Sequence, residues 1–146
     1  MYVNTRYLGK VYRVNNFTNT VKIATNTLRK YRQKHKFDAI AFTGTSGAAL
    51  AYPLSYTLKI PLICVRKSTR DNHFGSKVEG CYSVDKYIIV DDFIDTGSTI
   101  EKIQKAIKEE IKEAKLMGIY LYNTPSKSSR CDFDFGIIPI IKALKQ

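Results

Sequence analysis

The chain contains no tryptophan, only two histidines and three cysteines, and no long apolar run. The cysteines, at positions 64, 81 and 131, are too few and too scattered for a zinc cluster or a disulfide framework. No segment approaches the roughly 20 apolar residues that a membrane-spanning helix needs. Residues 1–10 are polar and lack the apolar core of a signal peptide. We therefore expect a cytoplasmic protein without a membrane segment.

Acidic residues are missing from the first 37 positions, although the whole chain carries 13 of them. The same segment holds nine of the 24 basic residues, namely Arg6, Lys10, Arg13, Lys22, Arg29, Lys30, Arg32, Lys34 and Lys36. Such one-sided charge is typical of proteins that bind a polyanion, either nucleic acid or a phosphorylated substrate. It is equally typical of a solvated helix face, and the sequence leaves both interpretations open.

The length of 146 residues predicts a single domain over residues 1–146. Between Thr18 and Lys36, apolar side chains recur at steps of three and four residues, at Val21, Ala24, Leu28 and Tyr31. This spacing predicts an amphipathic helix. Thr18 is its expected N-cap, and His35 is expected at its end as a partner of the helix dipole.

Four short apolar runs follow, at residues 39–42, 61–65, 87–90 and 119–122. Continuous apolar runs are typical of strands that are covered on both faces. Helical patterns lie between them, one to about Leu58 and one through Lys115, which Gly118 is expected to stop. Strands that alternate with helices predict a doubly wound α/β domain with a parallel sheet. The polar, aperiodic segment 66–85 predicts a long functional loop.

The third apolar run leads directly into Asp91 and Asp92, which places both acids where open α/β sheets bind ligands. The next turn contains Gly97, which permits a close approach of the main chain. It also supplies the hydroxyls of Thr96, Ser98 and Thr99. Together with the N–H groups of a helix start, these groups suit a phosphate. The alternative is a chance strand, turn and helix with acids in it.

Residues 88–99, IIVDDFIDTGST, resemble the signature of type I phosphoribosyltransferases that binds 5-phosphoribosyl 1-diphosphate (PRPP). The resemblance implies that Asp91 and Asp92 hold the ribose hydroxyls and favour an oxocarbenium-like transition state. It also implies a 5-phosphate site made by Asp95, Thr96, Gly97, Ser98 and Thr99. Asp95 is a third catalytic candidate, because 6-oxopurine transferases have a similar aspartate that handles the purine N7 proton.

Two further segments resemble parts of the same family. Thr43, Gly44, Thr45 and Ser46 resemble its pyrophosphate loop, whose amides at a helix start suit a diphosphate. Residues 66–75 resemble the mobile loop of orotate and adenine transferases. There Arg66, Lys67 and Arg70 would neutralise the leaving pyrophosphate. His73 is either a further pyrophosphate contact or an ordinary loop histidine.

Type I enzymes bind the base under a small hood from terminal segments, for which residues 1–17 and 126–146 are the candidates. Within the second segment, Phe133 and Phe135 would stack on a base, or else pack in the core. Asp95 points to a purine acceptor, whereas the pair Arg66 and Lys67 points to orotate or adenine. We expect a purine by a small margin.

The implied reaction is transfer of a 5-phosphoribosyl group from PRPP to a nucleobase, with release of pyrophosphate. Mg²⁺ would bridge pyrophosphate and ribose oxygens, and Asp91 and Asp92 would reach it through water. The family also implies a homodimer. The alternative is a non-catalytic regulator that senses PRPP or a nucleotide and binds RNA or DNA. The basic N-terminal segment favours that alternative, and the loop from Arg66 to Gly75 favours the enzyme.

Overall fold

Within the residues that the structure describes, five strands form a central sheet in the order β3-β2-β1-β4-β5. The computed structural model describes residues 8–67, 75–94 and 96–123. The strands are β1 (Ala39–Phe42), β2 (Leu62–Val65), β3 (Val78–Gly80), β4 (Lys86–Asp91) and β5 (Lys115–Leu121). β1 pairs in parallel with β2 and β4, β4 pairs in parallel with β5, and β3 runs antiparallel to β2 at one edge.

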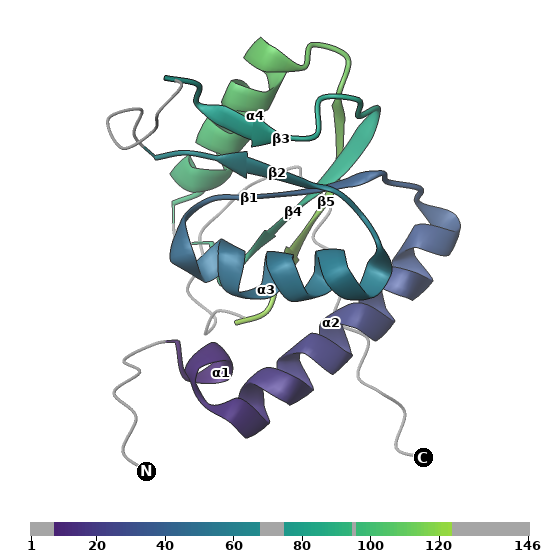
Figure 1. The fold of residues 1–146 in the computed structure, drawn as a ribbon, viewed down its shortest axis with the longest axis vertical. Helices are drawn as coiled ribbons and strands as arrows, with labels where there is room; N and C mark the ends of the chain where they lie inside the picture. The colour runs from purple at the N-terminus through teal and green to yellow at the C-terminus, as the bar shows by residue number, and fades with distance from the viewer. Residues whose placement is uncertain (1–7, 68–74, 95, 124–146) are drawn as a thin grey trace.

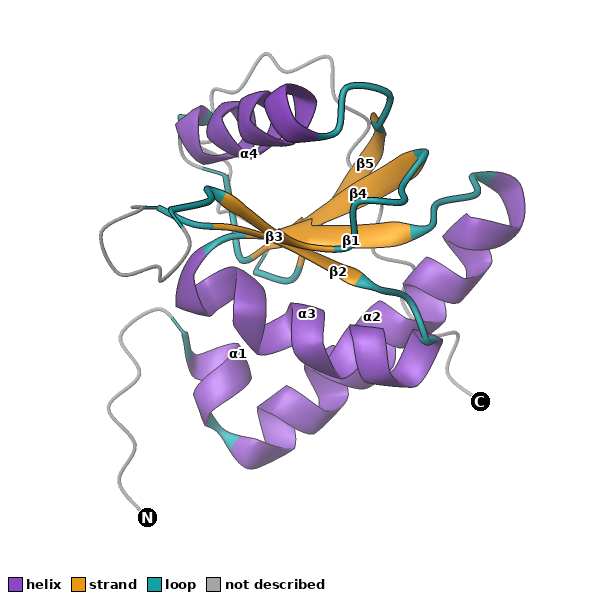
Figure 2. Cartoon of the chain, turned by 45° about the horizontal axis from the view of Figure 1, so that its top comes forward, coloured by secondary structure: helices purple, strands orange, loops and turns teal. Residues whose placement is uncertain are grey.

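Helices cover both faces of this sheet (Figures 1 and 2). They are α1 (Gly9–Tyr12), α2 (Val14–Lys34), α3 (Gly44–Leu58) and α4 (Ser98–Glu110). α4 lies on one face, and α1, α2 and α3 lie on the other (Figure 2). The predicted doubly wound α/β fold is therefore confirmed. In the described part of the chain, no helix is long and apolar enough to cross a membrane.

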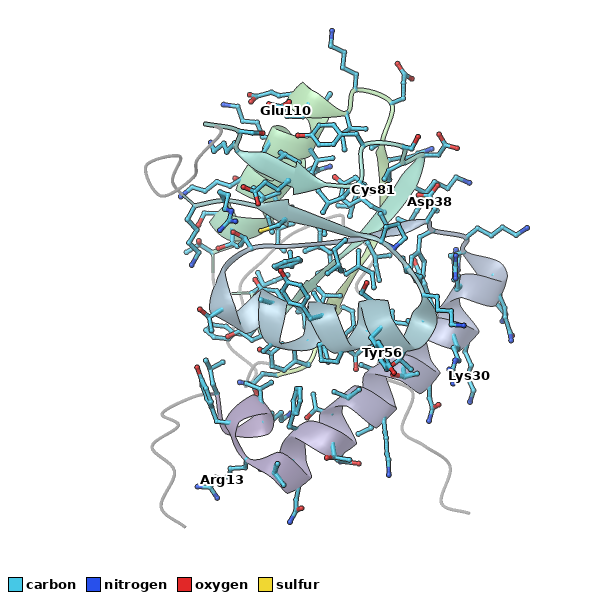
Figure 3. The ribbon with its side chains drawn as sticks, viewed as in Figure 1. Arg13, Lys30, Asp38, Tyr56, Cys81 and Glu110 are labelled. Carbon is cyan, nitrogen blue, oxygen red and sulfur yellow. The ribbon has the colours of Figure 1, made fainter. Side chains whose placement is uncertain are left out.

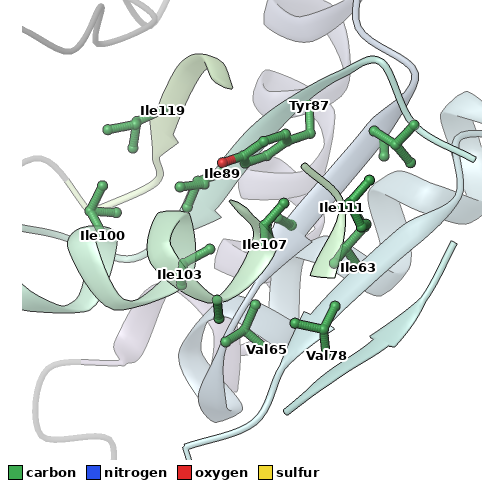
Figure 4. Close-up of a cluster of buried hydrophobic side chains, with 14 of the residues drawn as sticks. Ile63, Val65, Val78, Tyr87, Ile89, Ile100, Ile103, Ile107, Ile111 and Ile119 are labelled. Atoms are coloured by element: carbon green, nitrogen blue, oxygen red, sulfur yellow. The ribbon is translucent and has the colours of Figure 1, made fainter. Parts of the chain in front are cut away.

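Alternate residues of β4 supply the two halves of the core, because successive side chains of a strand point to opposite faces. Ile89 packs on the α4 side, against the isoleucine stripe of that helix (Figure 4). Ile88 and Val90 pack on the other side, against apolar residues of α2 and α3 such as Leu28 and Leu54. The sheet is thus buried on both faces, as its continuous apolar runs predict.

Two helix boundaries differ from the sequence-based expectation. α2 begins at Val14, so Thr18 lies inside the helix, where its hydroxyl donates to the Val14 carbonyl at 2.9 Å instead of capping the end. His35 does end the helix, as predicted, because its N–H donates to the Tyr31 carbonyl at 2.8 Å. α4 stops at Glu110, and β5 has already begun by Lys115. Gly118 therefore lies in β5 and does not end α4.

The segment 66–85, which we expected to be a loop throughout, contains the antiparallel edge strand β3. Its three residues are too few for a periodic pattern, which is why the sequence gives no sign of it. Gly80 has a φ of 118°, and a Cβ there would lie 2.1 Å from the Leu62 carbonyl oxygen. Only glycine can therefore end this strand so close to β2.

Candidate functional site

A cavity of about 250 Å³ opens where β1 and β4 end and where α3 and α4 begin. The register pairs Ala41 with Ile89, so the carboxyl ends of these two central strands lie side by side. The cavity is lined by predicted site residues from three separate segments, namely Thr43, Ser46, Lys67, Asp91, Asp92, Thr96, Gly97, Ser98 and Thr99. The fold therefore brings together most of the chemistry that the sequence predicts.

Asp91 and Asp92 are buried side by side in this cavity, each with 6% of its surface exposed. One oxygen of Asp91, Oδ1, accepts the Asp92 N–H at 2.9 Å and the Ser46 hydroxyl at 3.3 Å. The pKa of Asp91 is raised to about 7, chiefly by burial and, in second place, by its side-chain hydrogen bond with Asp92. At neutral pH the site thus holds an acid pair whose ionised form is stabilised by a ligand that donates hydrogen bonds or carries positive charge.

The end of β5 holds the acid pair in place. The N–H groups of Tyr122 and Asn123 donate to the carbonyls of Asp91 and Asp92, at 3.2 and 2.8 Å. The Tyr122 hydroxyl donates to the Ser46 carbonyl at 2.6 Å. Tyr122 thereby connects β4 to the start of α3. Sequence reasoning missed this role, and the only signal was a tyrosine at the end of an apolar run.

The turn before α4 has the geometry of a phosphate cradle. Gly97 adopts a φ of 83°, a left-handed conformation that favours glycine. The Thr96 hydroxyl donates to the Ser98 hydroxyl at 3.2 Å and accepts the Ser98 N–H at 3.3 Å. The N-cap residue of α4 is Gly97, which has no side chain to cap the helix. Helix N-termini of this kind attract anions. Asp95, which the sequence assigns to the same turn, lies outside the described residues.

The start of α3 supplies a second place for an anion. Gly44 has a φ of 65°, and a Cβ there would lie 3.1 Å from Lys67 Nζ, so the ammonium of Lys67 lies over the first turn of the helix. The Thr43 hydroxyl donates its proton to the Val65 carbonyl at 2.6 Å. An anion at this loop would therefore meet main-chain groups and Lys67 rather than the Thr43 hydroxyl. Thr45 lies in the first turn of the same helix.

The two basic residues after β2 have different surroundings. Arg66 forms an exposed salt bridge with Glu79 of β3, with 2.8 Å between Nη2 and Oε2. Arg66 lines a neighbouring cavity of about 510 Å³, whereas Lys67 lines both that cavity and the one with the acid pair. Lys67 is therefore the member of this pair that faces the site. Four other predicted site residues, Arg70, His73, Phe133 and Phe135, lie outside the described residues.

A family model described as PRTase-CE matches residues 3–141 of this chain. The chain belongs to the PRTase-CE family. Orotate phosphoribosyltransferase of Streptococcus agalactiae (serotype III) is 29% identical over 110 residues, which cover 73% of this chain and 53% of that protein. The protein of the same name from Cutibacterium acnes is 34% identical over 77 residues, 52% of this chain and 36% of that protein. The chain spans about half the length of the curated relatives it matches, or less.

Solved phosphoribosyltransferases share the fold of this PRTase-CE chain. Adenine phosphoribosyltransferase from Saccharomyces cerevisiae superposes with a TM-score of 0.71 at 17% identity, over 92% of this chain and 84% of that one. Orotate phosphoribosyltransferase from Aeropyrum pernix gives a TM-score of 0.57 at 20% identity, over 82% and 64%. Type I phosphoribosyltransferase membership, which residues 88–99 suggest, is confirmed. The names of the curated relatives give no support to the small preference for a purine.

Phosphoribosyltransferases generally use Mg²⁺ with PRPP, so the fit of that ion can be judged from the side chains. Within the described ranges, no group of three or more His, Cys, Asp or Glu residues could hold a metal ion. Mg²⁺ usually keeps several waters and is bound by one or two carboxylates together with substrate phosphates. Asp91 and Asp92 fit that mode, in which the ion arrives with a diphosphate, and do not fit a closed protein cage.

Proposed function

We propose that this chain binds PRPP in the cavity at the carboxyl ends of β1 and β4 and transfers its 5-phosphoribosyl group to a base, with release of pyrophosphate. One observation carries the proposal. A buried acid pair lies between two glycine-containing helix starts, and Lys67 covers one of them. A ribose with phosphate groups at both ends has the hydroxyls and the anionic groups that such a site complements.

Each part of the cavity has a distinct task in this proposal. Asp91 and Asp92 accept hydrogen bonds from the ribose hydroxyls, and their negative charge stabilises the positive charge that develops on the sugar as the bond to pyrophosphate breaks. The turn from Thr96 to Thr99 holds the 5-phosphate at the start of α4. Lys67 and the start of α3 hold the pyrophosphate. Mg²⁺, when bound, offsets the charge of the leaving group.

Most of the rate enhancement then comes from positioning and electrostatics. The acid pair does not move freely, because main-chain bonds from Tyr122 and Asn123 fix the peptide units that carry it. Ser46 orients the Asp91 carboxylate from the α3 side. The acids are therefore positioned before the substrate arrives, and little rearrangement is required when charge develops.

The acceptor is the finer part of the proposal. Asp95 favours a 6-oxopurine, whereas the curated relatives are orotate phosphoribosyltransferases. A panel of orotate, uracil, adenine, hypoxanthine and guanine, each with PRPP and Mg²⁺, distinguishes these acceptors through the nucleoside monophosphate that forms. We also propose that residues 1–146 form one domain and that the protein is a homodimer, which sedimentation can test.

The same panel tests the proposal as a whole. We expect pyrophosphate and one nucleoside monophosphate in equal amounts. Binding of PRPP without product from any base would favour a sensor of PRPP. Absence of PRPP binding in the folded protein would contradict the site itself.

A further inference from the structure

A second cavity, of about 790 Å³, lies at the opposite end of the sheet from the acid pair. It is formed where α2 and α3 end and where β1 and β4 begin, with Phe37 and Asp38 just before β1 and Lys86 as the first residue of β4. We call it the basic cleft. Because it lies at the amino ends of parallel strands, none of its lining residues belongs to the proposed PRPP site.

Five cations line the basic cleft, namely Arg29, Arg32, Lys36, Lys59 and Lys86. Two acids accompany them, Asp38 and Asp85. The Asp38 carboxylate already accepts the N–H groups of Asp85 and Lys86, at 3.2 and 3.1 Å. None of the five cations forms a salt bridge with any described residue. The cleft therefore carries five basic side chains against two acids, and none of the five is held in a salt bridge within the described part of the chain.

Stabilisation of helix ends accounts for only part of this charge. Arg32 lies in the last turn of α2, and its Nε donates to the Phe37 carbonyl at 3.0 Å. Its guanidinium carbon also lies 5.6 Å from the centre of the Phe37 ring. Arg32 thus has a structural role. Lys86, in contrast, begins a strand, so no helix dipole explains its position.

An exposed aromatic side chain lies on α3 one residue before the first α3 residue that lines the basic cleft. Tyr56 of α3 is 88% exposed, and the next residue, Thr57, lines the cleft. Figure 3 shows Tyr56 near the end of α3 and Lys30 on the neighbouring part of α2. The helix that carries Tyr56 has no charged residue. A basic groove beside an exposed aromatic ring is the arrangement that proteins use to bind single-stranded nucleic acid.

We propose that the basic cleft binds single-stranded nucleic acid, with Arg29, Lys36, Lys59 and Lys86 at the phosphates and Tyr56 stacked on a base. Such binding is tolerant of sequence, because every base has a flat face and every nucleotide has a phosphate. It does not depend on the proposed transferase function, since the two sites share no residue.

The test measures the affinity of the full chain for labelled single-stranded RNA and DNA of about 12 nucleotides over a range of salt concentrations. The double variant Arg29→Gln with Lys36→Gln should weaken binding and lower the slope of log affinity against log salt by about 1.4, at about 0.7 for each lost phosphate contact. The matched control is Lys108→Gln with Lys112→Gln, which removes the same charge from exposed positions in and after α4. The control should keep the wild-type slope.

Tyr56 gives an independent readout. Tyr56→Ala should weaken binding to single strands by roughly 5- to 100-fold, and Tyr56→Phe should bind like wild type, because the ring and not the hydroxyl stacks. An equal loss in the Lys108 and Lys112 control would show that net charge alone attracts the strand. Equal affinity for duplexes, with no effect of Tyr56→Ala, would also overturn the proposal, as would absence of binding at low salt.

Binding at the basic cleft and binding at the proposed PRPP site can be tested independently. Arg29→Gln with Lys36→Gln should bind PRPP like wild type, which also shows that this variant is folded. The double variant Asp91→Asn with Asp92→Asn should bind single-stranded nucleic acid as tightly as wild type. Loss of nucleic-acid binding in the aspartate variant, with its fold intact, would place the strand at the acid pair and contradict the basic cleft.

Discussion

The two ends of the parallel sheet carry opposite charges in opposite surroundings. At the carboxyl end, Asp91 and Asp92 are buried and held by main-chain bonds. At the amino end, long basic side chains such as Arg29 and Lys36 are exposed and form no salt bridge with a described residue. A buried charge is costly and fixed in position, which suits a reacting sugar. Exposed charged side chains cost little free energy, and they can adjust to a flexible single-stranded nucleic acid. One sheet therefore offers a rigid site and an adaptable one.

The largest expected effect comes from removal of the charge at the carboxyl end. Asp91→Asn with Asp92→Asn should lower turnover by about 10³-fold, because two preorganised carboxylates no longer stabilise the developing positive charge. Pyrophosphate release measures this loss, and circular dichroism checks that the fold is intact. A folded double variant with wild-type turnover would contradict the proposed roles of the two acids.

The buried position of Asp91 should also be visible in stability. Its pKa is raised from 3.8 to about 7, so the folded state holds the proton more tightly than the unfolded chain, and stability falls as the pH rises from about 4 to 7. Asp91→Asn removes that loss. The variant should exceed wild type by on the order of 4 kcal/mol at pH 8 and by little at pH 4.

Urea unfolding at both pH values measures the difference in the free energy of unfolding. The exposed Asp85, at the other end of the sheet, serves as the control. Asp85→Asn should change the free energy of unfolding by the same amount at pH 4 and at pH 8. A gap between wild type and Asp91→Asn that does not change with pH would contradict the raised pKa.

At the amino end of the sheet, Asp38 stabilises the fold, whereas the buried Asp91 at the carboxyl end destabilises it at neutral pH. Its carboxylate caps the N–H groups of Asp85 and Lys86, so Asp38→Ala should cost about 1–2 kcal/mol of stability. Because Asp38 lies far from the acid pair, turnover at a temperature where the variant is folded should stay at the wild-type value. Thermal unfolding and pyrophosphate release decide between a structural and a catalytic role.

The smallest expected effect distinguishes Lys67 from Arg66, the two basic residues that follow β2. Lys67→Gln should weaken PRPP binding by about tenfold, since its ammonium lies over the start of α3. Arg66→Gln breaks only an exposed salt bridge with Glu79 and should leave the affinity for PRPP unchanged. Calorimetric titration with PRPP and Mg²⁺ measures both variants. Equal losses of affinity would mean that Arg66 leaves Glu79 to join the pyrophosphate.

Local patterns predict much of this fold and part of the site. The apolar runs identify four strands because those strands are buried on both faces, and residues 88–99 identify the acid pair because its strand and turn are continuous in sequence. Contacts between distant segments leave no such trace. The bond from the Tyr122 hydroxyl to Ser46 joins residues 76 positions apart, and β3 is a strand only because β2 lies beside it.

The edge of the sheet also decides how freely one stretch of chain can vary. The N–H of Arg66 donates to the Lys77 carbonyl at 2.8 Å, so the chain leaves β2 and returns toward β3 at neighbouring points. A connection with its ends fixed in this way loses only about 0.6 kcal/mol of closure entropy for each doubling of its length. Insertions or exchanges between these two residues should therefore leave the acid pair and the sheet unchanged.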